Sequence, residues 1–302
     1  MSRDRRAALS LVLVMGVFWG LNWPAVKFTL SEIPPWTLRA LGFGIGAIFL
    51  AMLARRARQS LTPARSERAR LIVAGLLSVF GFNVLSAFGQ LLTATTKAAI
   101  IAFTMPMWAA VFSVLFLAES LNGARVGSLV LGMLGLLVLV HEDVAGFLYA
   151  PLGPLFMLGA AVSWAAGTVV LKSREWSLAP IARAAWLVGC SAPPAVVIAL
   201  IVDRPWTLDL PTAPVLLTLA YHIVFPMVIC HAAWVSLVGR LPASTAAIGT
   251  LLIPVVGVFS AGLLLGDALT WQVLTALALV LLSIALTFAW SAERSAAPDI
   301  VD

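Results

Sequence analysis

Charged residues are scarce in this chain, and none of its acidic residues lies in the middle of a long apolar stretch. Only 11% of the 302 residues are charged, 62% are hydrophobic, and the mean hydropathy is +1.04. A soluble core cannot absorb that much apolar surface, so the composition excludes a soluble domain and predicts an integral membrane protein. A proton-coupled exporter of organic cations normally needs a buried carboxylate, so the position of the acids argues against that class.

Other absences exclude further classes of protein. The connections between apolar stretches are short and hold no glycine-rich phosphate loop, which argues against an ATP-driven pump within this chain. Several deep basic residues, which a carrier of phosphates or nucleotide sugars would need, are also lacking. The two cysteines, Cys190 and Cys230, lie in separate apolar stretches and predict core packing rather than a disulfide or metal site. We therefore expect no bound metal and no cofactor.

Long apolar stretches are what the chain has instead. A membrane-spanning helix needs about 20 predominantly apolar residues, and continuous runs without strand-like alternation predict helices. The stretches that qualify are 8–27, 36–54, 70–91, 96–117, 124–140, 152–172, 181–201, 213–237, 243–265 and 271–290. The predicted fold class is therefore an all-α integral membrane protein with ten transmembrane helices.

The two halves of the chain repeat one pattern. Two sets of residues match at a spacing of 148, namely Ala98-Ala99-Ile100 … Pro106 … Glu119 and Ala246-Ala247-Ile248 … Pro254 … Asp267. Each half holds five predicted spans, and because five is odd, the second half enters the membrane from the opposite side. This predicts two inverted five-helix repeats, 1–148 and 149–302. Secondary transporters have this layout, with their site near the midplane between the repeats.

Basic residues are divided unevenly between the two sides of the predicted topology. Of the 19 Lys and Arg residues, Lys27, Arg39, Lys97 and Arg204 fall on one side and the remaining 15 on the other. The side richer in Lys and Arg faces the cytoplasm, so both termini are predicted to be cytoplasmic. Orientation alone explains the formal net charge of +6, so we expect no nucleic-acid partner.

Further matches make the repeat specific. The main pairs of segments are Trp19-Gly20-Leu21-Asn22-Trp23 with Ser163-Trp164-Ala165-Ala166-Gly167, Thr96-Lys97-Ala98-Ala99 with Ser244-Thr245-Ala246-Ala247, and Ala118-Glu119-Ser120-Leu121 with Gly266-Asp267-Ala268-Leu269. Arg39 and Arg183 open the second helix of each unit. This arrangement resembles the EamA-type branch of the drug/metabolite transporter superfamily over nearly the whole chain, and more loosely its aromatic amino-acid exporters. Asp267 departs from the pattern, where a second Glu would match Glu119.

The resemblance implies a secondary transporter of the bacterial inner membrane that exports small metabolites. A neutral or zwitterionic substrate needs neither a deep acid nor several deep bases, so amino acids, aromatic or otherwise neutral, are the favoured substrates. A multidrug or organic-cation exporter is the alternative within transport, and a membrane scaffold or sensor is the alternative from another class. The expected partners are a small-molecule substrate and the lipid bilayer, and a monomeric carrier fits this expectation.

Six residues in the predicted spans are candidate substrate contacts. Polar side chains inside a membrane usually face a cavity, and aromatic rings can stack on a planar substrate. The candidates are Trp19, Asn22, Asn83, Gln90, Trp164 and His231. Structural alternatives stay open for each: space filling for the tryptophans, an interhelical hydrogen bond for Asn22, and a satisfied core histidine for His231.

Two further features concern movement and protons. Pro106 and Pro254 occupy equivalent places in the two units, which favours hinges or broken helices over passive kinks. His222 and His231 are nine residues apart on one predicted helix, so we expect them on roughly opposite faces, with His231 the better candidate for the site. If a proton is transported, one of these histidines is the expected carrier.

Overall fold

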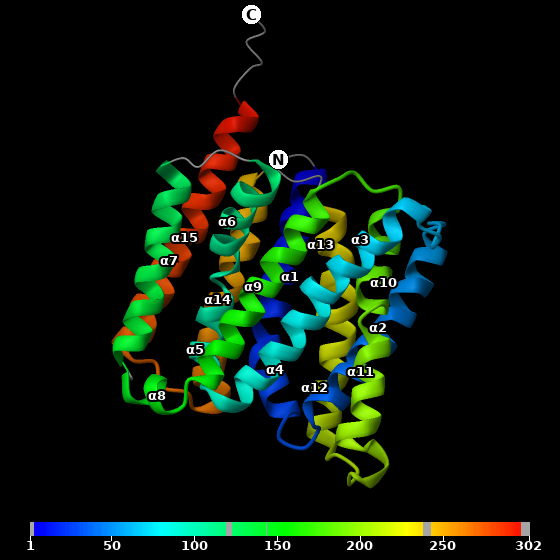
Figure 1. The fold of residues 1–302 in the computed structure, drawn as a ribbon, viewed down its shortest axis with the longest axis horizontal. Helices are drawn as coiled ribbons and strands as arrows, with labels where there is room; N and C mark the ends of the chain where they lie inside the picture. The colour runs from blue at the N-terminus through cyan, green and yellow to red at the C-terminus, as the bar shows by residue number, and fades with distance from the viewer. Residues whose placement is uncertain (1–2, 119–122, 143, 238–242, 297–302) are drawn as a thin grey trace, which may run out of the picture.

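The computed structural model describes residues 3–118, 123–142, 144–237 and 243–296, and every regular element within these ranges is a helix (Figure 1). In the first half the helices are α1 (Arg3–Thr29), α2 (Pro35–Arg56), α3 (Arg65–Gly75), η1 (Leu76–Gly81), α4 (Phe82–Leu92), α5 (Thr95–Ala102), α6 (Met105–Leu117), α7 (Gly123–Glu142) and α8 (Val144–Tyr149). In the second half they are α9 (Leu152–Lys172), α10 (Pro180–Gly189), α11 (Ala192–Ile198), η2 (Ala199–Asp203), η3 (Pro205–Thr207), α12 (Ala213–His222), η4 (Ile223–Cys230), α13 (His231–Leu237), α14 (Ala243–Leu265) and α15 (Trp271–Ala296).

The helices have the length and apolarity of membrane spans. Six single helices or stretches of successive helices are long and apolar enough to cross a membrane: Pro35–Arg56, Arg65–Leu92, Thr95–Leu117, Leu152–Lys172, Pro180–Asp203 and Ala213–Val235. Shorter apolar helices lie at Val126–His141, Leu251–Leu265 and Trp271–Leu286. The all-α class is confirmed, while the count of ten spans stays a prediction.

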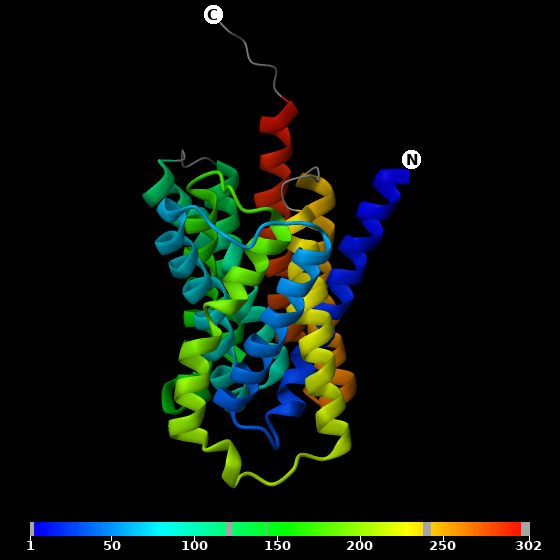
Figure 2. The same cartoon turned by 90° about the vertical axis from the view of Figure 1, so that its right-hand side faces the viewer.

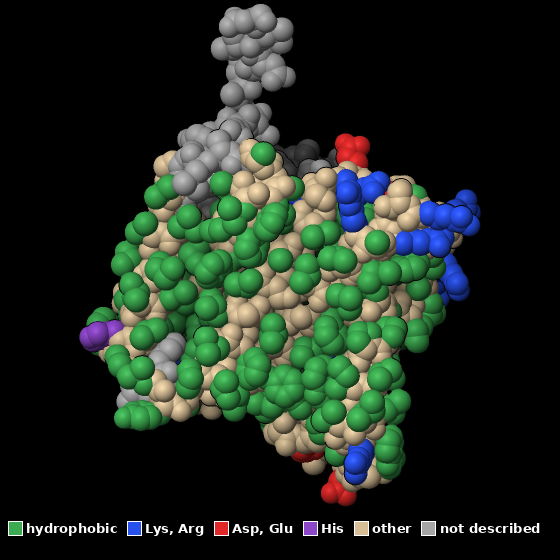
Figure 3. Space-filling model, viewed as in Figure 1, with side chains coloured by type: hydrophobic (Ala, Val, Ile, Leu, Met, Phe, Trp, Pro, Cys, Tyr) green, Lys and Arg blue, Asp and Glu red, His purple; other side chains and the backbone are tan. Residues whose placement is uncertain are grey.

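Side chains sort by type along the bundle. Figure 3 shows hydrophobic side chains over the middle of the visible face, with Lys and Arg gathered at one end, over the ends of α2 and α3. Helix α1 begins and α15 ends toward this same end (Figures 1 and 2). An apolar belt with basic residues at one rim is the expected surface of a protein that lies across a bilayer.

The two halves of the chain interleave in one bundle. Helix α1 packs along α14, α4 along α9, and α2 along α10 and α11. The main apolar core also draws on both halves, since Trp23, Ile100 and Phe103 pack with Ile253 and Val280. The interior of the bundle is therefore built from helices that are far apart in the sequence.

Among the described residues, three long helical stretches include a π-helical segment: η2 ends the stretch Pro180–Asp203, and the other two segments lie inside their stretches. Segment η1 covers Leu76–Gly81 between α3 and α4, and η4 covers Ile223–Cys230 between α12 and α13. They begin 147 residues apart (223 − 76), close to the spacing of the sequence repeat. Because π-helical turns are rare and frequently accompany functional sites, their recurrence draws attention to the residues that follow them.

At the N-termini of several helices, backbone N–H groups donate hydrogen bonds to side chains from the other half of the chain. Pro34, at the N-cap of α2, offers no side-chain cap. Asp203 instead accepts bonds from the Thr37 backbone N and Oγ1 at 2.6 and 2.9 Å. Asp267 likewise accepts a 2.8 Å bond from the Thr96 backbone N, at the start of α5. Asp267 therefore has a structural role at this helix end, whereas its repeat partner Glu119 lies outside the described residues.

The same arrangement recurs with donors and acceptors exchanged between the halves. Glu32, from the first half, accepts bonds from the backbone N and Oγ1 of Thr212, at the N-cap of α12. Glu67 and Gln59 accept bonds from the backbone N atoms of Ser177 and Ala182, before and within the first turn of α10. Each half thus satisfies orphan amides of the other.

Close contact between α9 and η1 requires a residue without a side chain. A Cβ built on Gly167 would lie 2.5 Å from the Ser78 backbone N and 2.6 Å from its Cβ, whereas one on Gly44 would meet nothing within 4 Å. We expect Gly167→Ala to force the two helices apart, at about 1–3 kcal/mol. Thermal unfolding of the purified protein in detergent should show a melting temperature several degrees lower.

Gly44→Ala is the matched control, because it makes the same change within a spanning helix where space is open. Its melting temperature should stay the same or rise slightly, since alanine is the better helix former. Equal melting temperatures for the two variants would contradict the close approach of α9 to η1.

Candidate functional site

Three polar side chains from three helices meet inside the bundle. His222 on α12 lies with Nδ1 2.8 Å from the Asn22 Oδ1 of α1, and with Nε2 3.4 Å from the Arg39 Nη1 of α2. Arg39 is 1% exposed and His222 is fully buried. The three residues therefore join the first half of the chain to the second through a polar contact within apolar surroundings.

The partners decide the protonation of the imidazole. An amide oxygen can only accept a hydrogen bond, so His222 Nδ1 carries the proton and donates to Asn22. A guanidinium can only donate, so His222 Nε2 accepts from Arg39. His222 is thus a neutral bridge with both ring nitrogens engaged.

His231 lies close to α1 as well. Its ring packs edge-on against Trp19, with centroids 5.7 Å apart and an interplanar angle of 88°, and Trp19 also packs edge-on against Trp234. His231 Nδ1 donates to the Pro226 carbonyl at 2.7 Å, and the buried Nε2 has no hydrogen-bond partner. This imidazole therefore presents an unused acceptor beside an aromatic ring.

The prediction that His222 and His231 occupy opposite faces is wrong. Both rings contact α1, His222 at Asn22 and His231 at Trp19. The residues between the two histidines form η4, and a π-helix takes more residues per turn than an α-helix. The wider turn changes the angle between the two positions, which α-helical spacing could not reveal.

The polar residues predicted on the third span are buried and partly used by the fold. Asn83 Nδ2 donates to the Val79 carbonyl at 2.9 Å, just as His231 donates to a carbonyl of η4. Ser86 donates to the Asn83 carbonyl at 3.0 Å. Gln90 is 2% exposed, and its side-chain Oε1 has no partner. Asn83 thus helps to close a π segment, while Gln90 keeps an acceptor free.

Trp164 on α9 packs against Phe82, which follows η1. Their ring centroids are 5.0 Å apart at 66°, an edge-on contact. Both Phe82 and Trp19 border the core cluster that contains Trp23 and Phe103. The two predicted tryptophans are therefore linked through one set of aromatic and apolar side chains, although the structure records no direct contact between them.

The two equivalent prolines have different local structures. Pro106 is in the first turn of α6, directly after the break that separates α5 from α6 at Phe103 and Thr104. Pro254 lies inside α14, which continues as one helix. The first site is a broken helix, and whether either proline acts as a hinge stays a prediction.

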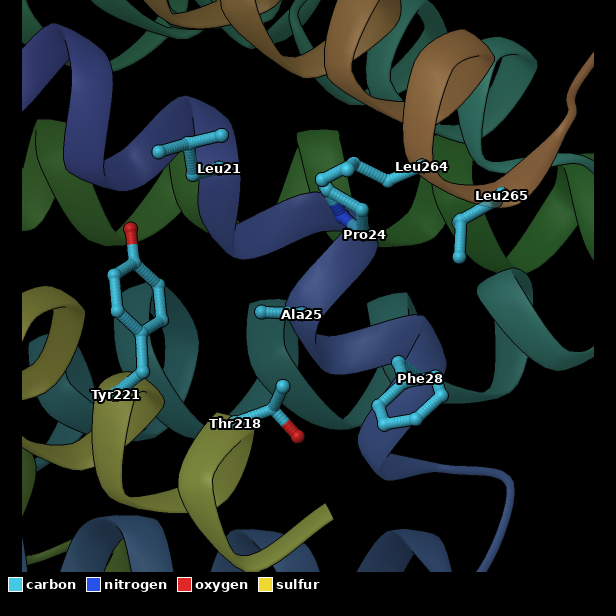
Figure 4. A pocket seen from close by; sticks show the side chains of 8 residues that line it. All are labelled: Leu21, Pro24, Ala25, Phe28, Thr218, Tyr221, Leu264 and Leu265. Carbon is cyan, nitrogen blue, oxygen red and sulfur yellow. The ribbon is translucent and has the colours of Figure 1, made fainter. Parts of the chain in front are cut away.

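A pocket opens elsewhere on the bundle, between α1, α12 and α14 (Figure 4). Its volume is about 280 Å³, and its lining is mainly apolar: Leu21, Pro24, Ala25, Phe28, Thr218, Tyr221, Leu264 and Leu265. The Tyr221 hydroxyl donates to the Phe18 carbonyl at 2.8 Å. This lining includes none of the six predicted contact residues, so the pocket is distinct from the polar interior described above.

The chain matches one known family along almost its entire length. The EamA-like transporter family covers residues 6–141 and again 151–289. The chain belongs to the EamA-like transporter family.

Several relatives of this EamA-like transporter carry names. It is 30% identical over 296 residues to the "Uncharacterized transporter YvbV" of Bacillus subtilis (strain 168), covering 97% of this chain and 94% of that protein. It is 28% identical over 273 residues to a "Probable amino-acid metabolite efflux pump" of Escherichia coli (strain K12), covering 86% and 87%. It is 27% identical over 166 residues to the "Aromatic amino acid exporter YddG" of Ancylobacter novellus, covering 53% and 57%. The resemblance seen in the sequence is confirmed.

Two basic residues of this EamA-like transporter that the sequence assigns to the ends of spans make contacts within the bundle. Arg39 was counted as a topology-setting charge, yet it is the fifth residue of α2 and points inward. The sequence also counts Lys27 among the charges that set the topology, yet its Nζ donates to the Gln90 carbonyl, and it interacts electrostatically with Asp267. The signal was available, because an ionisable side chain inside an apolar span is a functional candidate by default.

The contact between Asn22 and His222 can be measured by a double-mutant cycle. Asn22→Leu leaves the buried His222 N–H without an acceptor, which should destabilise this EamA-like transporter by about 1–3 kcal/mol. Combining it with His222→Phe should destabilise less than the sum of the single changes, with a coupling of about 0.5–3 kcal/mol. Unfolding of the purified protein in detergent provides the measurement.

The control cycle pairs Asn22→Leu with Tyr221→Phe. Tyr221 neighbours His222 in sequence and bonds to α1, but to the Phe18 carbonyl rather than to Asn22. The effects of this pair should add. Additive effects in both cycles would show that the Asn22–His222 bond contributes nothing.

Proposed function

We propose that this EamA-like transporter exports small zwitterionic metabolites, most of all neutral and aromatic amino acids, by alternating access. In this proposal, residues 1–148 and 149–302 are two inverted five-helix repeats, and substrate binds between them. The substrate contacts are Trp19, Asn22, Asn83, Gln90, Trp164 and His231, and Pro106 and Pro254 allow the fourth and ninth spans to bend. The protein would work as a monomer in the bacterial inner membrane, without a cofactor.

One observation carries this proposal. His231 Nε2 and Gln90 Oε1 are buried acceptors without partners, and the aromatic ring of Trp19 lies beside the first of them. A buried acceptor left unpaired is costly, so such groups are usually satisfied by a ligand, by water or by another conformation of the protein. The ammonium group of an amino acid supplies three donors, and its aromatic side chain suits the neighbouring rings.

The relatives support the same substrate class. Two are named as a probable amino-acid metabolite efflux pump and an aromatic amino-acid exporter. An organic-cation exporter would be served by a carboxylate in mid-span. Asp203 and Asp267 instead bind helix amides near span ends, which leaves these carboxylates little role in binding a cation.

Trp164 tests the aromatic part of the proposal. Removing a stacking ring typically loses about 0.5–1.5 kcal/mol beyond its area, which corresponds to about two- to tenfold in affinity. In proteoliposome counterflow, Trp164→Ala should therefore weaken phenylalanine transport several-fold more than threonine transport. Trp164→Phe should recover part of the loss, because a ring remains.

Trp271→Ala is the matched control, since Trp271 starts α15 and is 67% exposed. It should leave the ratio of phenylalanine to threonine transport unchanged. Equal losses for the two substrates in Trp164→Ala would remove Trp164 from the site, and wild-type counterflow of organic cations but of no amino acid would overturn the proposed substrate class.

The proposed topology can be checked independently of substrate. We expect the loop at 56–65 and the C-terminus to lie in the cytoplasm, because the Arg-rich ends of α2 and α3 gather at one end of the bundle. Reporter fusions in that loop and after the last residue should both give cytoplasmic signals, and a fusion at 207–211 a periplasmic one. A periplasmic signal from either of the first two would contradict two inverted repeats.

A further inference from the structure

Arg39 is a buried cation that has no counter-charge among the residues the structure describes. It is 1% exposed, lies inside a helix long and apolar enough to cross a membrane, and has Nε without a hydrogen-bond partner. Its described polar contact is with His222 Nε2 at 3.4 Å, a long bond to a neutral ring. Within the described residues, no carboxylate makes an ion pair with this guanidinium.

Such a group is expensive to keep in the interior. Removing a guanidinium from water costs several kcal/mol, which only a well-placed counter-ion and further hydrogen bonds can offset. One contact with an imidazole leaves most of the five N–H donors and the whole charge uncompensated. A charge retained under these conditions indicates a role in binding.

The equivalent arginine of the second half provides the comparison. Arg183 is in the first turn of α10, as Arg39 is near the start of α2, at a spacing of 144 residues (183 − 39). Arg183 interacts electrostatically with Glu67, whose carboxylate also bonds to Ser177 and Arg174. Glu67 thus serves as an acid for the second arginine, whereas no carboxylate in the described part of the chain pairs with the first.

The surroundings of Arg39 match one end of a zwitterion. A guanidinium can bind a carboxylate through two parallel hydrogen bonds. A ligand that carries an amide or an amine in place of the carboxylate cannot form this charged pair. His222 contacts Arg39 and interacts electrostatically with both Arg39 and His231. A carboxylate at Arg39 and an ammonium group toward the free His231 Nε2 would place opposite charges of one ligand on complementary groups.

We infer that Arg39 binds the carboxylate of the transported substrate, which restricts the substrates to carboxylate-bearing metabolites. The inference rests on the proposed function and specifies its substrate class. In the bound state the carboxylate replaces His222 Nε2 as the acceptor of the Arg39 donors. His222 keeps its bond to Asn22, so α1 and α12 stay joined while α2 exchanges a protein contact for a substrate contact.

The test compares two probes that differ only at the carboxylate. Phenylalanine and phenylalaninamide share the ring and the ammonium group, but only the first is anionic at the carbonyl end. Both are offered to the full-length protein in proteoliposomes, as competitors of labelled phenylalanine in counterflow. Wild-type protein should prefer phenylalanine by about 10- to 100-fold, as a charge-assisted hydrogen-bond pair predicts.

Arg39→Gln should reduce this preference to about twofold or less, chiefly by weakening phenylalanine. Arg39→Lys should retain an intermediate preference, because it keeps the charge and loses the two-pronged geometry. Arg183→Gln is the matched control: it removes an equivalent arginine that already has an acid, and its preference should equal that of wild type. If Arg39→Gln does not yield folded protein, Arg39→Lys with thermal-shift binding of the same two probes gives the comparison.

The outcomes separate the two hypotheses. Wild-type transport of phenylalanine with an unchanged preference in folded Arg39→Gln or Arg39→Lys would overturn the role of Arg39 and leave the proposed function standing. Equal loss of preference in the Arg39 and Arg183 variants would overturn it too. Absence of amino-acid counterflow by wild-type protein would instead contradict the proposed function itself.

Discussion

Hydrocarbon offers no hydrogen-bond partner, so every polar group inside the bundle must find one within the protein or bind one from outside. Most interior polar side chains of this transporter obey that constraint locally. Asn83 and His231 each donate to a carbonyl of a π segment, and Asn22 accepts from His222. The few that remain unpaired, Arg39 Nε and Gln90 Oε1 among them, are therefore the informative ones. The proposed substrate contacts follow from these few unpaired groups.

The class of fold could be predicted from the sequence because it depends on sums over many residues. Apolar stretches of about 20 residues report helices that cross a bilayer whatever their detailed packing. The spacing of 148 residues between equivalent motifs indicates the internal repeat, and the motifs themselves resemble those of the EamA-type transporters. Such signals survive local irregularities, since a displaced turn or a broken helix changes neither the composition of a span nor the order of its motifs.

The residues that line the interior could be predicted only in part, because the direction in which a side chain points depends on the number of residues in each helical turn. On α-helical spacing the sequence favours His231 over His222 for the site, but the π-helical segment η4 places both against α1. Arg39 was assigned to the rim because positive charges near span ends usually set orientation. Burial is a property of the assembled bundle, and His222, the polar contact of Arg39, lies on α12, 183 residues further along the chain.

The exchange of helix caps between the halves has a consequence for how the protein is made. Helix α2 ends its first turn at Thr37, but the carboxylate that binds this turn belongs to Asp203, which the ribosome adds 166 residues later. Likewise, the backbone N–H of Thr96 binds Asp267, which is added 171 residues later. During synthesis, the first helices therefore stand in the membrane with open amides until the second half arrives. Insertion of the early spans and capping of their N-terminal amides are therefore separate events. The caps form only after the acids of the second half have been synthesised.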